Sequence, residues 1–183
     1  SAIVSSPLAA PPWAACALTR EPPAVPAPAP NEFTVAGYNI ENYVGAEIQR
    51  RKAALNVRTV MHSPDVIGVV EIGSKAALQQ LADEINGSAI AAGEPNPQYV
   101  AELIPFGTFS QHVGFLVKTS RVTINAVTQE QADEVFTNPA TGTAESLHDR
   151  PPLVLDATVD PAGRNPGRIL VVVNHLRSFI DIE

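Results

Sequence analysis

Two predicted strands end in polar side chains whose chemistry suits a divalent metal. The segment GYNIEN, residues 37–42, contains Asn39, and the segment VVEIGS, residues 69–74, contains Glu71. One predicted helix separates them, and a right-handed strand-helix-strand crossover makes the strands parallel and brings their C-terminal ends to one sheet edge. A carboxylate and a carboxamide should therefore meet. Because Mg²⁺ prefers hard oxygen ligands and retains several waters, one or two carboxylates suffice, and Glu71 fits that requirement.

Each of these two residues also has a simpler interpretation. A Glu at a strand end is often solvent-exposed without any role, and an Asn in this context commonly closes the strand with an Asx turn. Glu41 and Asn42 are predicted to be turn residues. For Asn39 the turn and the functional interpretation both stay open at this point.

Two later segments carry further candidate groups. Arg150 lies in HDRPPLVLDATV, residues 148–159, and His175 lies in ILVVVNHLRSF, residues 169–179. A guanidinium binds phosphate oxygens in a bidentate way, whereas a strand-end imidazole donates to a phosphoryl oxygen or transfers a proton. The competing interpretations are a surface arginine and a histidine that is satisfied by local backbone groups.

Together these segments resemble the endonuclease/exonuclease/phosphatase superfamily, over roughly residues 33–183. The resemblance implies that Glu71 binds the divalent metal, with Mg²⁺ as the first choice and Mn²⁺ or Ca²⁺ as alternatives. It implies that Asn39 orders the phosphate and the metal-bound water. It also implies that Arg150 approaches a substrate phosphate and that His175 contacts the scissile phosphate as a catalytic residue.

Two features depart from the pattern of that superfamily. Its nuclease branch has an acidic residue that orients the catalytic histidine, and the closest position here is Gln111, in FSQHVGFLVKTSRVTI. Glutamine accepts a hydrogen bond but does not stabilise an imidazolium as a carboxylate does. The superfamily's Gly-Asp-x-Asn and Ser-Asp-His segments do not occur in the sequence. The resemblance thus implies about the first half of the catalytic domain, inactive or nearly so alone, because loss of a catalytic base typically costs about 10²- to 10⁴-fold.

In the first part of the chain, predicted strands and helices alternate. In the second part, most of the predicted elements are strands. The predicted order is a strand over 33–40, a helix over 46–62, a strand over 65–72, and a helix capped by Ser74 with Gly87 in its C-terminal left-handed position. Further strands are predicted over 99–104, 112–119, 121–127, 153–159 and 168–175, with an irregular surface excursion over 128–149. This order predicts an α/β or α+β domain. The resemblance implies a four-layer α/β/β/α sandwich, of which this chain holds one sheet and two helices.

Composition divides the chain into a Pro/Ala-rich leader or linker, residues 1–31, and a domain, residues 32–183. The first thirty residues contain eight prolines and nine alanines, a linker composition. The net charge of −7 argues against a protein that coats nucleic acid with Lys and Arg. It does not exclude an enzyme that binds phosphate through a divalent cation. No apolar run of about 20 residues predicts a membrane span.

The expected function is that of a metal-dependent phosphodiester hydrolase acting on nucleic acid or another phosphoester. A secreted or cell-surface nuclease is the first choice, because the leader resembles the linkers of secreted bacterial multidomain nucleases. A phosphatase or lipid phosphodiesterase of the same fold is one alternative. A non-catalytic binding module that retains the fold is another. The missing C-terminal half of the domain is an expected partner.

Overall fold

The computed structural model describes residues 26–107, 110–160 and 165–176. Its helices and strands are β1 (Val35–Tyr43), α1 (Glu47–Thr59), β2 (Val66–Ile72), α2 (Lys75–Ala91), β3 (Tyr99–Glu102), β4 (His112–Lys118), β5 (Val122–Gln129), β6 (Val135–Thr137), β7 (Ala144–Ser146), β8 (Leu153–Val159) and β9 (Gly167–Val173). The predicted leader lies mostly outside these residues.

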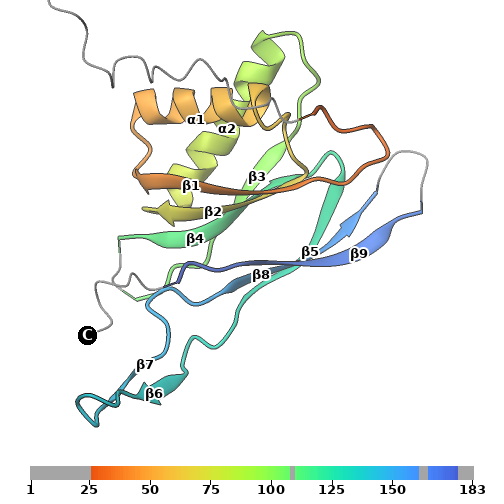
Figure 1. Cartoon of the computed structure of the whole chain (residues 1–183). Coiled ribbons are helices and arrows are strands. Elements are labelled where there is room, and N and C mark those ends of the chain that lie inside the picture. Colours follow the sequence, from red (N-terminus) through yellow and green to blue (C-terminus); the bar gives the residue numbers. More distant parts are fainter. Residues whose placement is uncertain (1–25, 108–109, 161–164, 177–183) are drawn as a thin grey trace, which may run out of the picture.

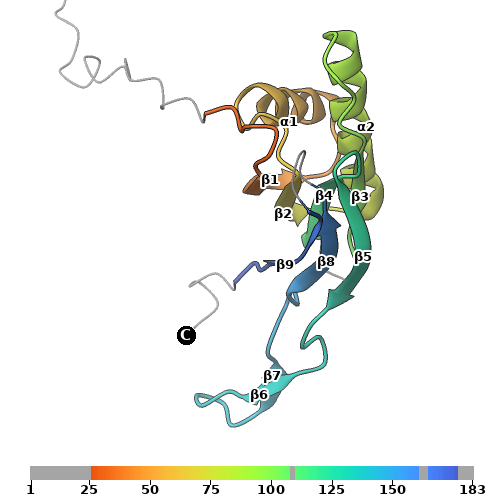
Figure 2. The ribbon, with the colours of Figure 1, turned by 90° about the vertical axis from the view of Figure 1, so that its right-hand side faces the viewer.

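The chain forms an α+β fold with two main sheets and two helices (Figure 1). A four-stranded sheet has the order β1-β2-β4-β3, and a three-stranded sheet has the order β5-β8-β9. The helices lie on one face of the four-stranded sheet, and the three-stranded sheet lies on its other side (Figures 1 and 2). The prediction of a single sheet was wrong, because the chain turns between β4 and β5 and continues into a second sheet.

The first crossover is parallel, as the sequence predicts. β1 pairs with β2 in a register that joins Val35 to Val66 and Asn39 to Val70. β2 also pairs antiparallel with β4, so it is a central strand with neighbours on both sides. Layers of structure cover both of its faces, which explains its nearly continuous apolar sequence.

Two apolar cores flank the four-stranded sheet. In one, α2 buries Leu78, Leu81 and Ile85, which follow the helical period, against the inner face of the sheet. In the other, Phe115 of β4 and Leu155 of β8 belong to the buried layer between the two sheets. The helix layer, the four-stranded sheet and the three-stranded sheet therefore stack in that order.

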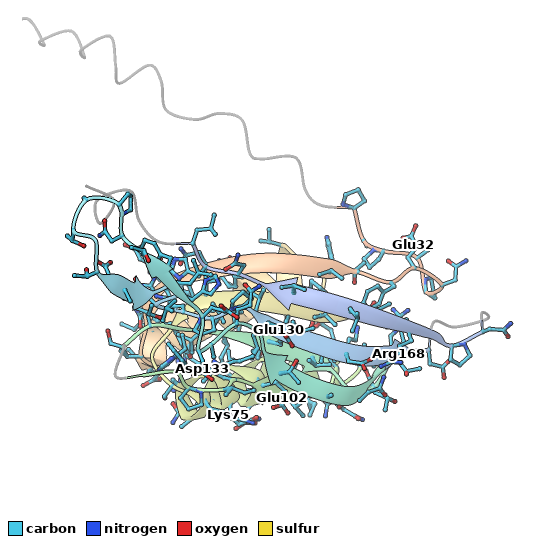
Figure 3. The ribbon with its side chains drawn as sticks, turned by 90° about the horizontal axis from the view of Figure 1, so that it is seen from below. Glu32, Lys75, Glu102, Glu130, Asp133 and Arg168 are labelled. Atoms are coloured by element: carbon cyan, nitrogen blue, oxygen red, sulfur yellow. The ribbon has the colours of Figure 1, made fainter. Side chains whose placement is uncertain are left out.

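The helix α2 begins where the sequence predicts and ends later. The Ser74 side chain accepts a hydrogen bond from the Ala77 amide at 3.1 Å, which is an N-cap. The next residue, Lys75, pairs with Glu102 of β3 at 2.9 Å (Figure 3). These contacts fix the start of α2 beside the end of β2.

The predicted end of this helix at Gly87 was wrong. The helix continues to Ala91, and the left-handed glycine is Gly93, with φ of 74°. Two hydrogen bonds between the Asn86 side chain and the Tyr99 backbone, at 2.8 and 3.0 Å, hold the helix against β3 at the residue before Gly87, and Ala89 beyond it is buried. A tertiary contact thus overrides the local glycine signal.

The stretch predicted as irregular, residues 128–149, contains more structure than expected. β5 extends to Gln129, and β6 and β7 pair as a short hairpin that projects away from the sheets (Figure 1). Strands of three residues carry too few alternating positions to give a sequence signal. Among the described residues, no helix is both long enough and apolar enough to cross a membrane.

Candidate metal and phosphate site

The ends of β1 and β2 bring the predicted amide and acid into direct contact. Asn39 Nδ2 donates a hydrogen bond to Glu71 Oε1 at 2.8 Å. The backbone amide of Asn42 donates to the other carboxylate oxygen, Oε2, at 3.2 Å. Both oxygens of Glu71 are therefore oriented by groups from the neighbouring strand.

A β-bulge aims the Glu71 side chain. Val70 pairs with Val113 and Ile72 pairs with His112, so Glu71 is an extra residue in β2 relative to β4. Its φ is 66°, a left-handed conformation that is uncommon for residues other than glycine. Such conformations cost about 1–3 kcal/mol and cluster at functional sites. The bulge removes Glu71 from the regular alternation of the strand.

β1 is also irregular where it lies beside Glu71, because its register with β2 shifts between Asn39 and Tyr43. Glu41 and Asn42 also have positive φ, of 47° and 51°. Glu41 donates its backbone amide to Asn39 Oδ1 at 2.8 Å, which is the Asx turn considered from the sequence. The two interpretations of Asn39 are thus compatible, because its oxygen closes the turn while its nitrogen holds Glu71.

The carboxylate and the imidazole are close to each other. His175 Nε2 lies 3.8 Å from Glu71 Oε1, and the two side chains are 21% and 17% exposed. His175 follows the end of β9, which runs toward the same side of the molecule as β1 and β2 (Figure 1). Its Nδ1 is buried and has no hydrogen-bond partner in the described part of the chain. Local backbone groups therefore do not satisfy the Nδ1 of His175 in the described part of the chain, contrary to the simpler interpretation of this residue.

Arg150 is partly buried and belongs to the same group of side chains. Its Nη2 donates to Gln111 Oε1 at 2.8 Å, and Gln111 Nε2 donates in turn to Asn42 Oδ1. Arg150 Nε is buried without a hydrogen-bond partner among the described residues. Gln111 thus contacts the arginine and an asparagine, and no hydrogen bond joins it to His175 within the described residues.

The surroundings of Glu71 and His175 lower the pKa of both side chains. The hydrogen bond from Asn39 is the main cause that lowers the pKa of Glu71, and the Asn42 amide and the charges of His175 and Arg150 lower it further against the effect of burial. Burial lowers the pKa of His175, the Arg150 charge adds to this, and Glu71 opposes it. Near neutral pH the site therefore presents an ionised carboxylate and a neutral imidazole.

Sequence reasoning missed two members of this group. Asn42 was predicted to be only a turn residue, and Gln111 was considered only as a partner of His175. The neighbouring His112 is half-buried, and its pKa is lowered by burial and then by Arg150. The clustering of polar residues after GYNI and before VGFL was the signal that could have found Asn42 and Gln111.

The residues present fit a magnesium ion held by few protein ligands. Across the described ranges, no group of three or more His, Cys, Asp and Glu side chains could hold a metal. Mg²⁺ does not require such a group, because one carboxylate, waters and substrate phosphate oxygens complete its coordination. The lowered pKa keeps Glu71 in the ionised form that a metal needs.

A hollow of about 430 Å³ leads away from this group between β1 and β9. Its walls include Val35 and Gly37 of β1 and Val172 of β9, and both Asn39 and Asn174 line it as well. Asn39 is thus the member of the candidate site that borders this hollow.

The chain is an α+β protein with mixed sheets, and known proteins resemble it in structure. No protein-family model matches its sequence, and no curated protein matches it. D. rerio TDP2 complexed with a single-strand DNA product matches with a TM-score of 0.45 and 17% identity, over 81% of this chain and 48% of that chain. A humanized D. rerio TDP2 with 14 mutations gives a TM-score of 0.43 and 18% identity, over 80% and 51%.

A functionally unknown conserved protein from Enterococcus faecalis gives a TM-score of 0.44 and 12% identity, over 79% of this chain and 53% of that chain. This chain therefore spans about half the length of the structures that it matches. The likeness is one of fold and assigns no activity to this chain.

Proposed function

We propose that this chain carries the metal- and phosphate-binding part of a phosphodiester hydrolase of the endonuclease/exonuclease/phosphatase type. The observation that supports this most is the meeting of an acid, an amide and an imidazole from three separate strand ends. Glu71 lies 2.8 Å from Asn39 and 3.8 Å from His175, measured between the nearest polar atoms. The positive charge of Arg150 lowers the pKa of both Glu71 and His175.

The proposed role of each residue is the one that the resemblance implies. Glu71 would hold Mg²⁺, with Mn²⁺ or Ca²⁺ as alternatives, and a bound ion there supplies positive charge against the charge developing on phosphoryl oxygens. Asn39 orients that carboxylate and orders the phosphate. Arg150 clamps phosphate oxygens. His175, neutral near pH 7, contacts the scissile phosphate and accepts or donates a proton.

The proposed domain is larger than this chain. β1 and β9 each pair with one strand within the described residues, and they expose Val35, Leu170 and Val172. A C-terminal half that paired with these edges would complete the four-layer sandwich and supply the base that activates water. A nuclease is the proposed member of this class. A secreted or cell-surface location is proposed with it, on the Pro/Ala-rich composition of residues 1–31.

Metal binding by the chain itself tests the proposal. Mn²⁺ titrated into the chain should enhance water-proton relaxation in a saturable way, and Glu71→Gln should weaken this binding by at least about tenfold, since even the loss of a ligand's supporting partner costs that much. Glu47→Gln is the matched control, because Glu47 is 62% exposed on α1 and pairs only with Arg51 in the described structure. Equal Mn²⁺ affinity in wild type and Glu71→Gln would contradict the metal role.

Activity is tested in a protein that joins this chain to the proposed C-terminal half of the domain. Magnesium-dependent cleavage of plasmid DNA and of bis(4-nitrophenyl) phosphate should be lost with Glu71→Gln and retained with Glu47→Gln. Hydrolysis of a phosphomonoester or of sphingomyelin, without cleavage of DNA, would support a phosphatase or lipid phosphodiesterase instead. Metal binding without hydrolysis of any of these would indicate a binding module.

A further inference from the structure

Gln111 connects the two ends of the candidate site. Its amide oxygen accepts from Arg150 Nη2 at 2.8 Å, and its amide nitrogen donates to Asn42 Oδ1. Asn42 also donates its backbone amide to Glu71 Oε2 at 3.2 Å. A continuous row of hydrogen bonds therefore runs from the carboxylate, through Asn42 and Gln111, to the guanidinium.

The two contacts of Gln111 use both ends of its side-chain amide. A primary amide has one acceptor oxygen and one donor nitrogen group, and here each has a different partner. The arginine on one side offers only donors, so it fixes which end of the amide faces it. Gln111 consequently holds Arg150 in one orientation relative to the strand ends.

Gln111 also differs in charge from the residue that the resemblance implies at this position. A carboxylate beside Arg150 would form an ion pair and weaken the attraction of the guanidinium for an anion. Glutamine accepts the same hydrogen bond without adding a negative charge. The Nε of Arg150 is buried and has no hydrogen-bond partner among the described residues, so the protein satisfies this guanidinium only in part.

We propose that Gln111 is a positioning residue that orients Arg150 for an anionic, phosphate-like group of the substrate while adding no competing charge. This inference rests on the proposed phosphate role of Arg150. It assigns to Gln111 a partner other than His175.

Phosphate affinity separates this role from a merely structural one. Inorganic phosphate is titrated into the chain without metal and followed by NMR, for wild type, Gln111→Glu, Gln111→Met and Arg150→Met. Gln111→Met loses both hydrogen bonds without adding charge, so a merely structural role predicts lower stability with unchanged phosphate affinity of the folded chain. The proposed role predicts weaker phosphate binding by folded Gln111→Met, and at least about tenfold weaker binding by Gln111→Glu, which also places a negative charge beside the phosphate. Gln49→Glu, at an exposed position on α1, adds the same charge far away and should bind as wild type.

Orientation is measured without any ligand. The ¹⁵Nε relaxation of Arg150 should report greater mobility in Gln111→Met, which keeps the side-chain length and loses both hydrogen bonds. If Gln111→Met binds phosphate as wild type does and Arg150→Met does not, the role of Gln111 is refuted and the phosphate role of Arg150 stands. If Arg150→Met binds as wild type does, the proposed phosphate role fails and the inference falls with it.

Discussion

At the scale of single residues, the site combines two groups whose pKa values are both lowered. For Glu71 the main cause is the hydrogen bond from Asn39, and for His175 it is burial. In both cases the folded chain binds protons less readily than the unfolded chain, so acidification favours unfolding. The contribution of His175 to stability is present above its unfolded pKa of about 6.5 and falls as pH decreases toward its folded pKa. The contribution of Glu71 is lost at lower pH, below about 4.3.

The charges around His175 predict opposite effects of two substitutions. Arg150→Met should raise the pKa of His175, because it removes a nearby positive charge that disfavours the imidazolium. Glu71→Gln should lower it further, because the carboxylate stabilises the imidazolium. The His175 Cε1 proton shift, followed by NMR against pH, measures both changes. Arg51→Met, on the exposed face of α1, serves as the control. Shifts of the same sign in both variants would contradict the placement of these charges.

At the scale of elements, regular structure was more predictable from sequence than its interruptions. The bounds of β8 match the prediction at both ends, and the parallel crossover followed from the order of strands and helix. The bulge at Glu71 could not be predicted, because a left-handed residue other than glycine has no composition signal. The partner of Gln111 could not be predicted either, since its contact with Arg150 joins residues 39 positions apart. Such non-local contacts depend on how two sheets meet.

Gly114 in β4 shows how closely the elements pack beneath the site. A Cβ there would lie 2.8 Å from Leu78 Cδ2 and 2.9 Å from the backbone oxygen of Glu102. The leucine tip can rotate, but the backbone of β3 cannot move without disturbing its ladder with β4. Gly114→Ala should therefore destabilise the chain by about 1–3 kcal/mol, the usual cost of overpacking.

Urea unfolding of the chain, followed by circular dichroism, measures this cost. Gly37→Ala is the matched control, because Gly37 is also in a strand and a Cβ there meets nothing within 4 Å. It should leave stability unchanged or slightly higher, since alanine loses less conformational freedom than glycine on folding. Equal stability of the two alanine variants would contradict the close packing at β4.

At the scale of the whole molecule, one buried acid joins the two sheets. Asp65, just before β2, is 1% exposed. Its Oδ2 accepts from the Thr34 amide at 3.0 Å and from the Thr34 hydroxyl at 3.3 Å. Its Oδ1 lies 3.3 Å from Nη1 of Arg121, which precedes β5 in the other sheet. Arg121 also donates to the backbone oxygens of Pro30 and Glu32 at 3.1 and 2.8 Å. The chain entering β1 and the start of the second sheet are thus held by the same ion pair.

Substitution of Asp65 should lower the free energy of unfolding of the whole molecule. Removing one partner of a buried ion pair costs about 3–5 kcal/mol of stability. Asp65→Ala should cost no more than the lower end of this range, because the Arg121 side chain is 22% exposed and water partly solvates its charge. Asp65→Asn should cost less, since an amide oxygen still accepts from Thr34. The double variant Asp65→Ala with Arg121→Met should recover part of the lost stability, because no unpaired cation remains. The control is Asp83→Ala, at an exposed position on α2.

Urea unfolding midpoints of these four variants and of Arg121→Met alone test whether the ion pair holds the two sheets together. The ion pair is at the opposite end of β2 from Glu71, so Asp65→Asn should keep the Mn²⁺ affinity of the folded chain while lowering its stability. A double variant as unstable as the sum of the two single changes would show that Asp65 and Arg121 act separately. In that case the apolar layer between the sheets alone would hold them together, and the strand ends at the site would depend on that layer for their position.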